Sequence, residues 1–155
     1  MINRYKQGIT TVELLIIIVV LGIIFSIVFP QFSKIRENQV LKNGVADVLS
    51  SINKARSQTL SSLNSSEYGV RFESDKVIIF KGKVFSDVDP TNEIINITMP
   101  ANITNTTLGG ISGISGDMYF NRLSGTPSAD GAITLSTTNY SKIITISATG
   151  VASVN

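Results

Sequence analysis

The residue types that perform most enzyme chemistry are missing from this 155-residue chain, which contains no Cys and no His. Without Cys there is no thiol nucleophile, disulfide framework or thiolate ligand for zinc. Without His the commonest general base and transition-metal ligand is absent. No G-x-x-x-x-G-K phosphate-binding loop is present either. The composition disfavours most hydrolase and metalloenzyme classes, and we expect neither catalytic activity nor a cofactor.

One acidic residue stands out by its position. Glu13 is followed by an uncharged apolar run from Leu14 to Phe29, and Pro30 comes directly after that run. As a helix, the 18 residues from Val12 to Phe29 would be about 27 Å long, close to the ~30 Å hydrocarbon thickness of a bilayer. A carboxylate in such a segment costs roughly 2–3 kcal/mol at depth and less near the interface. Glu13 therefore needs an explanation beyond membrane anchoring.

Two simple interpretations of the apolar run are a secretory signal peptide and a plain membrane anchor. A signal peptide has an apolar core of about 7–15 residues followed by small residues at its cleavage site. This run is longer and ends in Phe29-Pro30-Gln31-Phe32. A plain anchor explains the hydrophobicity but not Glu13. Basic residues occur on both sides of the run, so the positive-inside rule does not set its orientation.

The segment Gly8-Ile9-Thr10-Thr11-Val12-Glu13, with basic residues before it and the apolar run after it, resembles the class III signal of type IV pilins and pseudopilins. In that family a prepilin peptidase cuts after the Gly on the cytoplasmic side and methylates the new N-terminus. The resemblance places the cut between Gly8 and Ile9, where the family most often has Phe at the position of Ile9. Cleavage would remove Arg4 and Lys6 and leave 11 basic and 11 acidic residues.

The resemblance also implies a domain organisation and a membrane topology. Residues 1–8 are the leader, and residues 9–32 form a transmembrane and filament-core helix with a helix joint at Gly22 and Pro30. The N-terminus lies in the cytoplasm, the helix crosses the inner membrane once, and the rest of the chain is extracytoplasmic. The implied partners are a prepilin peptidase, other pilin or pseudopilin subunits, the inner-membrane assembly platform and membrane lipid.

Cleavage after Gly8 would create an ammonium group at Ile9, and Glu13 lies about one helical turn further on the same face. An unpaired ammonium and an unpaired carboxylate are each costly inside a bundle of apolar helices. The two groups can therefore neutralise each other. The resemblance favours a pair between neighbouring subunits, with Glu13 setting the assembly register. A pair within one chain is the alternative.

The chain after the apolar run predicts an α+β protein. From Ser33 to about Asn64 apolar residues recur mostly at spacings of three and four, which predicts an amphipathic helix over residues 33–64. The predicted apolar stripe consists of Leu41, Val45, Val48, Ile52, Ala55, Leu60 and Leu63. Residues 65–155 are rich in Ser, Thr, Asn and Gly, which suits an antiparallel β-rich head with one face in solvent. Strands are predicted at 68–72, 76–81, 93–99, 117–121, 132–136, 142–147 and 151–154. We expect the long N-terminal helix to pack on this head, which is the pilin fold that the resemblance implies.

The head resembles one subfamily. The segments Tyr68-Gly-Val-Arg-Phe72, Met118-Tyr-Phe-Asn-Arg-Leu-Ser-Gly125 and Lys142 to Val151 are similar to the minor pseudopilin H/minor pilin T group. The resemblance implies a structural subunit, minor rather than major, of a type IV pilus or a type II secretion pseudopilus. The alternative is a membrane-anchored β-rich binding module that does not polymerise.

Three other patterns in the head carry little weight. Asp87, Asp89, Asn92 and Glu93 offer oxygen ligands, but their spacing matches no EF-hand loop, so we predict no metal site. The head contains six basic and eight acidic residues, which does not indicate a nucleic-acid partner. Four N-x-[ST] sequences are expected by chance in a chain this rich in those residues. The basic residues that could form a patch for nucleic acid are Arg71, Lys76, Lys81 and Lys83. The four N-x-[ST] sequences of the head begin at Asn96, Asn102, Asn105 and Asn139.

Overall fold

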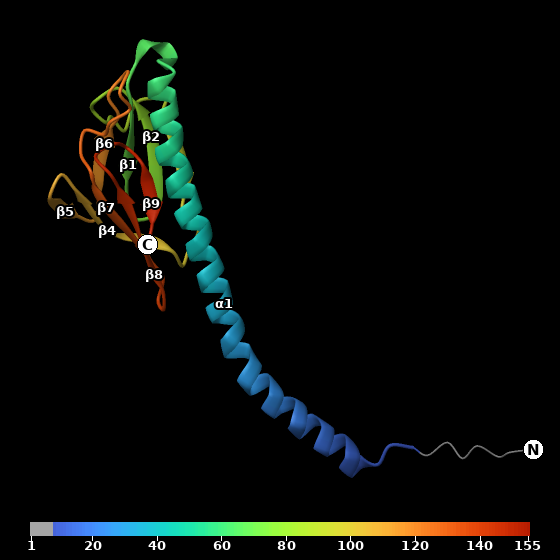
Figure 1. Ribbon diagram of the computed structural model, residues 1–155. Coiled ribbons are helices and arrows are strands. Elements are labelled where there is room, and N and C mark those ends of the chain that lie inside the picture. The colour runs from blue at the N-terminus through green and yellow to red at the C-terminus, as the bar shows by residue number, and fades with distance from the viewer. Residues whose placement is uncertain (1–7) are drawn as a thin grey trace, which may run out of the picture. The chain divides into compact units, whose positions relative to one another are not determined.

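The computed structural model describes residues 8–155, apart from the side chain of Pro30. Of the predicted leader, only Gly8 lies within the described residues. The chain divides into two compact units, residues 1–36 and residues 37–155. One helix, α1 (Thr11–Leu60), contributes residues to both units (Figure 1).

The described part of the first unit consists of residues 8–10 and the N-terminal portion of α1. The most apolar 18-residue window of α1 has a mean hydropathy of 3.1, and the helix is long and apolar enough to cross a membrane. Its large apolar side chains, from Val12 to Phe29, are exposed in the single chain. A helix is the form that such a segment must take in lipid, because its backbone groups can find partners only within the segment.

The second unit consists of the C-terminal part of α1, a short 3₁₀ helix η1 (Leu63–Ser65) and two antiparallel sheets. The first sheet has the order β3-β2-β1-β6 and the second has the order β5-β4-β7-β8-β9. The strands of the first sheet are β1 (Tyr68–Phe72), β2 (Lys76–Lys81), β3 (Glu93–Asn96) and β6 (Gly116–Tyr119). Those of the second are β4 (Asn102–Leu108), β5 (Ile111–Gly113), β7 (Gly131–Ser136), β8 (Ser141–Ile146) and β9 (Ala152–Val154). This arrangement confirms the predicted α+β class.

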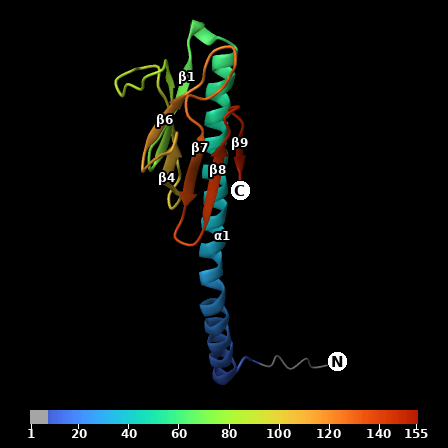
Figure 2. The ribbon, with the colours of Figure 1, turned by 60° about the vertical axis from the view of Figure 1, so that its left-hand side comes forward.

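A single apolar core joins the helix to both sheets. The buried stripe of α1 is the predicted one as far as Ala55, and it consists of Leu41, Val45, Val48, Ile52 and Ala55. It shares the core with Val70 and Phe72 of the first sheet and with Ile133 and Leu135 of the second. In Figure 2 the strands β7, β8 and β9 lie along this part of the helix. Burial of this stripe is what stabilises the amphipathic part of α1, since packing contributes more to helix stability than intrinsic propensity does.

The predicted end of the helix is wrong by four residues. The helix ends at Leu60 instead of Asn64, and the side chains of Leu60 and Leu63 are 45% and 44% exposed instead of buried. Ser62, Asn64 and Ser65 have φ values of 51°, 51° and 54°, in the left-handed region that a right-handed helix excludes. Just before this turn, the Thr59 hydroxyl accepts a hydrogen bond from the backbone N–H of Tyr68 (2.9 Å), so the start of β1 is held against the last helical turn.

Most of the predicted strands are present, and two strands were missed. β1 and β2 form the predicted hairpin, with Tyr68 opposite Lys81 and Phe72 opposite Val77. The third predicted strand is shorter than expected, because it ends at Asn96 instead of Met99. The sequence pattern predicted neither β4 nor β5. In β4 a register shift between Ile103 and Asn105 interrupts the alternation of inward and outward side chains, and its Asn residues have low strand propensity.

The first sheet also has a small second cluster on the face turned away from the core. Ile78 and Phe80 are buried there although they are not part of the main core. The ring of Phe85, from the loop after β2, packs edge-on against Phe80 with centroids 5.5 Å apart. The Arg71 guanidinium lies 4.8 Å from the centre of the Phe85 ring. The loop after β2 is therefore held against the sheet by aromatic and cation–π contacts.

Candidate functional site

The predicted cleavage position lies in an exposed, non-helical stretch just before α1. Gly8, Ile9 and Thr10 are all exposed, and the Ile9 side chain is 71% exposed. Among residues 8–155, and apart from its neighbours in the chain, no heavy atom lies within 4 Å of the position that a Cβ on Gly8 would occupy. The Gly8–Ile9 peptide bond is thus open to a protease. Its hydrolysis would release the leader and leave an α-ammonium group on Ile9.

Thr10 caps the helix, a role that was not predicted from the sequence. Its Oγ1 accepts a hydrogen bond from the backbone N–H of Glu13 (3.3 Å), and its carbonyl accepts one from Leu14 N–H (3.1 Å). A Thr followed three residues later by a Glu is the sequence pattern of a capping box. The spacing of Thr10 and Glu13 is therefore the signal that could have identified the start of α1.

Glu13 consequently has two possible roles, and both follow from its position. It lies in the first turn of α1, where the partial positive charge of the helix N-terminus stabilises a carboxylate by about 0.3–1 kcal/mol at an exposed site. It also lies four residues after Ile9, as an ammonium–carboxylate pair requires. In the uncut chain the Ile9 nitrogen belongs to a peptide bond, so that pair has no ammonium partner until cleavage has occurred.

The remainder of the segment is an apolar surface without a covering partner in the single chain. The rings of Phe25 and Phe29 stack with centroids 5.6 Å apart. Further along, Ile27, Val28, Gln31, Phe32 and Ile35 line a shallow groove on the helix surface. Exposed apolar area of this extent is unfavourable in water and favourable against lipid or another apolar helix.

The helix is not interrupted at the predicted joint. α1 continues through both Gly22 and Pro30. Pro30 has no N–H to donate to the Ser26 carbonyl, so the helix is weaker by one hydrogen bond at this point. Apart from its chain neighbours and the backbone of the helix itself, a Cβ on Gly22 would meet no described heavy atom within 4 Å, so packing in the described part of the chain does not require glycine there. The joint remains a prediction about the assembled state.

In the head, acidic neighbours pair with most of the basic residues considered as a patch. The Glu73 carboxylate pairs with the Arg71 guanidinium (3.0 Å) and with the Lys76 ammonium (3.3 Å). Arg71 also contacts Asp117 at 3.4 Å. The hydrogen bond from Arg71 is the main cause that holds the pKa of Glu73 below its usual range, with a further contribution from Lys76. These ion pairs offset the positive charges of Arg71 and Lys76.

Asp89, Asn92 and Glu93, three of the oxygen-bearing residues weighed as metal ligands, make local contacts. The Asp89 carboxylate accepts hydrogen bonds from the N–H and the hydroxyl of Thr91 (2.9 and 2.7 Å), which lower its pKa. Asn92 Nδ2 donates to the Ser86 carbonyl at 2.7 Å, and Glu93 pairs with Lys54. Within residues 8–155 no cluster of three or more His, Cys, Asp or Glu residues is arranged to hold a metal ion.

No protein-family model, curated protein or solved structure matches this chain.

Proposed function

We propose that this chain is a structural subunit, of minor rank, of a type IV pilus or a type II secretion pseudopilus. Prepilin peptidase would cut it after Gly8 and methylate Ile9. The inner-membrane assembly platform would then add it to a filament of pilin or pseudopilin subunits. The chain would cross the inner membrane once, with the leader in the cytoplasm and the head outside, and it would perform no catalysis of its own.

A single observation carries the proposal. The accessible Gly8–Ile9 bond comes directly before a capped helix that is apolar and exposed along its first part and that holds one carboxylate, Glu13, in its first turn. A plain anchor needs neither the accessible bond nor the carboxylate. A subunit that must be released from a leader and then aligned with identical helices has a use for both.

The assembly step follows from elementary electrostatics. After cleavage, the Ile9 ammonium and the Glu13 carboxylate are both too costly to leave unpaired among apolar side chains. A new subunit whose ammonium reaches the Glu13 of its neighbour neutralises both charges, and a subunit in the wrong register does not. The apolar surface of α1 provides the contact area, and the charge pair selects one register for it.

The test is the mass of the chain extracted from membranes of cells with and without an active prepilin peptidase. The expected product begins at Ile9 and carries one methyl group, and it appears only with the peptidase. A chain still intact at Met1, beside a control prepilin that the same peptidase has cut, would overturn the proposal. That result would favour the membrane-anchored β-rich binding module that does not polymerise.

A further inference from the structure

β3 forms an open edge of the first sheet. Among residues 8–155 it pairs with β2 alone. Immediately beyond β3, Ile97 N–H donates a hydrogen bond to the Asp75 carbonyl at 2.8 Å, so these two residues are a hydrogen-bonded pair of the antiparallel ladder. Hydrogen-bonded and non-hydrogen-bonded pairs alternate along such a ladder. Counting back from Ile97, the N–H and C=O groups of Ile94 and Asn96 point away from β2.

The β1–β2 ladder supports this orientation independently. Glu73 N–H donates to the Lys76 carbonyl (3.0 Å). The backbone N–H and C=O groups of Lys76 and of every second residue after it in β2 therefore point toward β1. The backbone groups of the residues between them, Val77 and Ile79, therefore point toward β3, where their partners are Ile95 and Glu93. Ile94 and Asn96 thus offer two donors and two acceptors at an unpaired edge, and the Ile94 side chain is 56% exposed.

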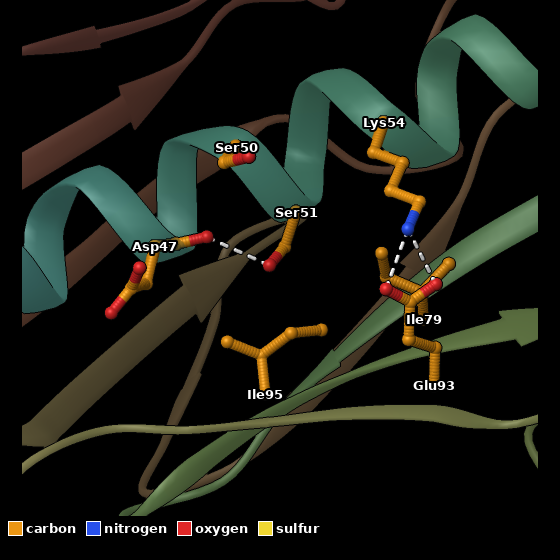
Figure 3. Close-up of a pocket in the computed structure, with 7 residues that line it drawn as sticks. All are labelled: Asp47, Ser50, Ser51, Lys54, Ile79, Glu93 and Ile95. Carbon is orange, nitrogen blue, oxygen red and sulfur yellow. Dashed lines mark hydrogen bonds and ion pairs between the residues drawn. The ribbon is translucent and has the colours of Figure 1, made fainter.

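A pocket of about 190 Å³, lined by both polar and apolar groups, lies beside this edge, between α1 and the sheet (Figure 3). Four residues of α1 line one side of it, and residues of β2 and β3 line the other. The lining residues are Asp47, Ser50, Ser51, Lys54, Ile79, Glu93 and Ile95. An extended segment added to β3 would have every second side chain on the face that carries this pocket.

The pocket carries an excess of negative charge. Lys54 Nζ contacts both carboxylate oxygens of Glu93, at 2.5 and 2.7 Å, so these two charges neutralise each other. The Ser51 hydroxyl donates to the backbone carbonyl of Asp47 at 2.7 Å. The Asp47 carboxylate has neither a hydrogen bond nor an ion pair within the described part of the chain. In Figure 3 it lies at the opposite end of the pocket from Lys54.

We propose that the β3 edge and this pocket bind an extended segment of a different protein that carries a Lys or Arg side chain. The backbone of the segment would pair with Ile94 and Asn96, as in strand addition to an open sheet edge. Its basic side chain would enter the pocket and pair with Asp47. Its next side chain would lie on the opposite face, beside Ile94. The proposal depends on the head alone, so it does not depend on the proposed role in a filament.

The direct test is amide hydrogen exchange on the full chain in detergent micelles, with and without a soluble probe peptide. The probe is acetyl-Thr-Val-Thr-Lys-Thr-Val-Thr-amide, and the matched control carries Glu in place of Lys. With the Lys peptide at saturation we expect the Ile94 and Asn96 amides to exchange at least about tenfold more slowly, and the Ile95 amide, which already bonds to β2, to change little. Unchanged exchange at Ile94 and Asn96 would overturn the proposal.

Two substitutions separate the backbone contribution from the charge contribution. Ile94→Pro removes an N–H that points away from β2, a position where proline is tolerated, and it should abolish peptide binding, whereas Ile94→Val should retain it. Asp47→Asn should weaken the Lys peptide by about two- to fivefold, as for a partly exposed ion pair, and should not weaken the Glu peptide. Equal binding of both peptides to the unchanged chain would contradict the assignment of the pocket.

A second copy of this chain is the other possible occupant of the edge. It would appear as protection of Ile94 and Asn96 that rises with protein concentration when no peptide is present, and it would overturn the proposal of a different, basic partner. The exchange measurement on the unchanged chain decides the outcome even if Ile94→Pro does not fold.

Discussion

The backbone N–H of Glu13 donates a hydrogen bond to Oγ1 of Thr10, with the two atoms 3.3 Å apart. This contact places Glu13 at the third position of α1 and makes it part of the helix start. A carboxylate at that position stabilises a helix end in any protein. The capping role and the register role of Glu13 make different predictions, and the charge of the side chain distinguishes them.

Glu13→Gln should insert normally and should block assembly. Glutamine also serves at the third position of a capping box, so the start of the helix is preserved, but the charge that neutralises the Ile9 ammonium is lost. The measurement is the yield of filaments or pseudopili relative to the amount of cleaved subunit in the membrane. Normal yield would show that the carboxylate acts in capping and does not set the register.

Thr10→Ala is the matched variant for the cap. It should weaken the first turn of α1 by about 1 kcal/mol, with Thr10→Ser as the conservative control, and it leaves the charge of Glu13 in place. We expect faster exchange of the Glu13 amide and assembly close to normal. If Thr10→Ala blocks assembly as completely as Glu13→Gln, the two residues act together through the cap.

Pro30→Ala should stiffen α1 at the predicted joint. Alanine supplies the N–H that proline lacks, and replacing an interior proline stabilises a helix by up to about 3 kcal/mol. The new amide at position 30 should be protected from exchange in micelles, and assembly should slow if the joint must lose helical structure. Gly22→Ala tests the other residue of the predicted joint, and it should slow assembly less, since it gains only about 1 kcal/mol of propensity and adds no hydrogen bond. Assembly at an unchanged rate would place the joint elsewhere.

Ile52→Ala should destabilise the head by about 2–5 kcal/mol, because Ile52 is fully buried between α1 and the sheets and its truncation leaves a cavity. Leu123→Ala is the matched control, because Leu123 is 88% exposed and its truncation should change the free energy of unfolding by less than about 0.5 kcal/mol. Denaturant unfolding of the full chain in micelles, followed through the head, measures both. Equal effects would contradict the burial of the helix stripe.

Acid should weaken the head through Glu73. Its pKa is lowered in the folded state, chiefly by the Arg71 hydrogen bond, so its contribution to stability is complete above the ordinary Glu value of about 4.3. That contribution is lost as the pH falls through the lower folded value. Melting temperatures measured from pH 6 to pH 2.5 should therefore fall less steeply for Glu73→Gln than for the unchanged chain. In an Arg71→Gln background the difference should shrink, and a difference of the same size would assign the effect to another group.

The pattern of apolar residues along the chain predicted the fold well where each element depends on its own composition. The stripe from Leu41 to Ala55 was correct because its apolar residues repeat at the helical period. The β1–β2 hairpin was correct because two short apolar runs flank the turn residues Ser74 and Asp75. β4 was missed because its pairing with β7 stabilises a strand whose alternation is broken at Ile103 and Asn105. The capping role of Thr10 could have been found from the spacing of Thr10 and Glu13.

By itself the sequence determined the segment that can cross a membrane and the place of Glu13 within it. Both depend on side-chain chemistry along a continuous stretch of chain, which needs no tertiary partner to be recognised. Only the tertiary structure decided which β3 groups remain unpaired and that Asp47 and Glu93 line one pocket. These features depend on contacts between residues far apart in the chain, and the local periodicity of a sequence does not contain that information.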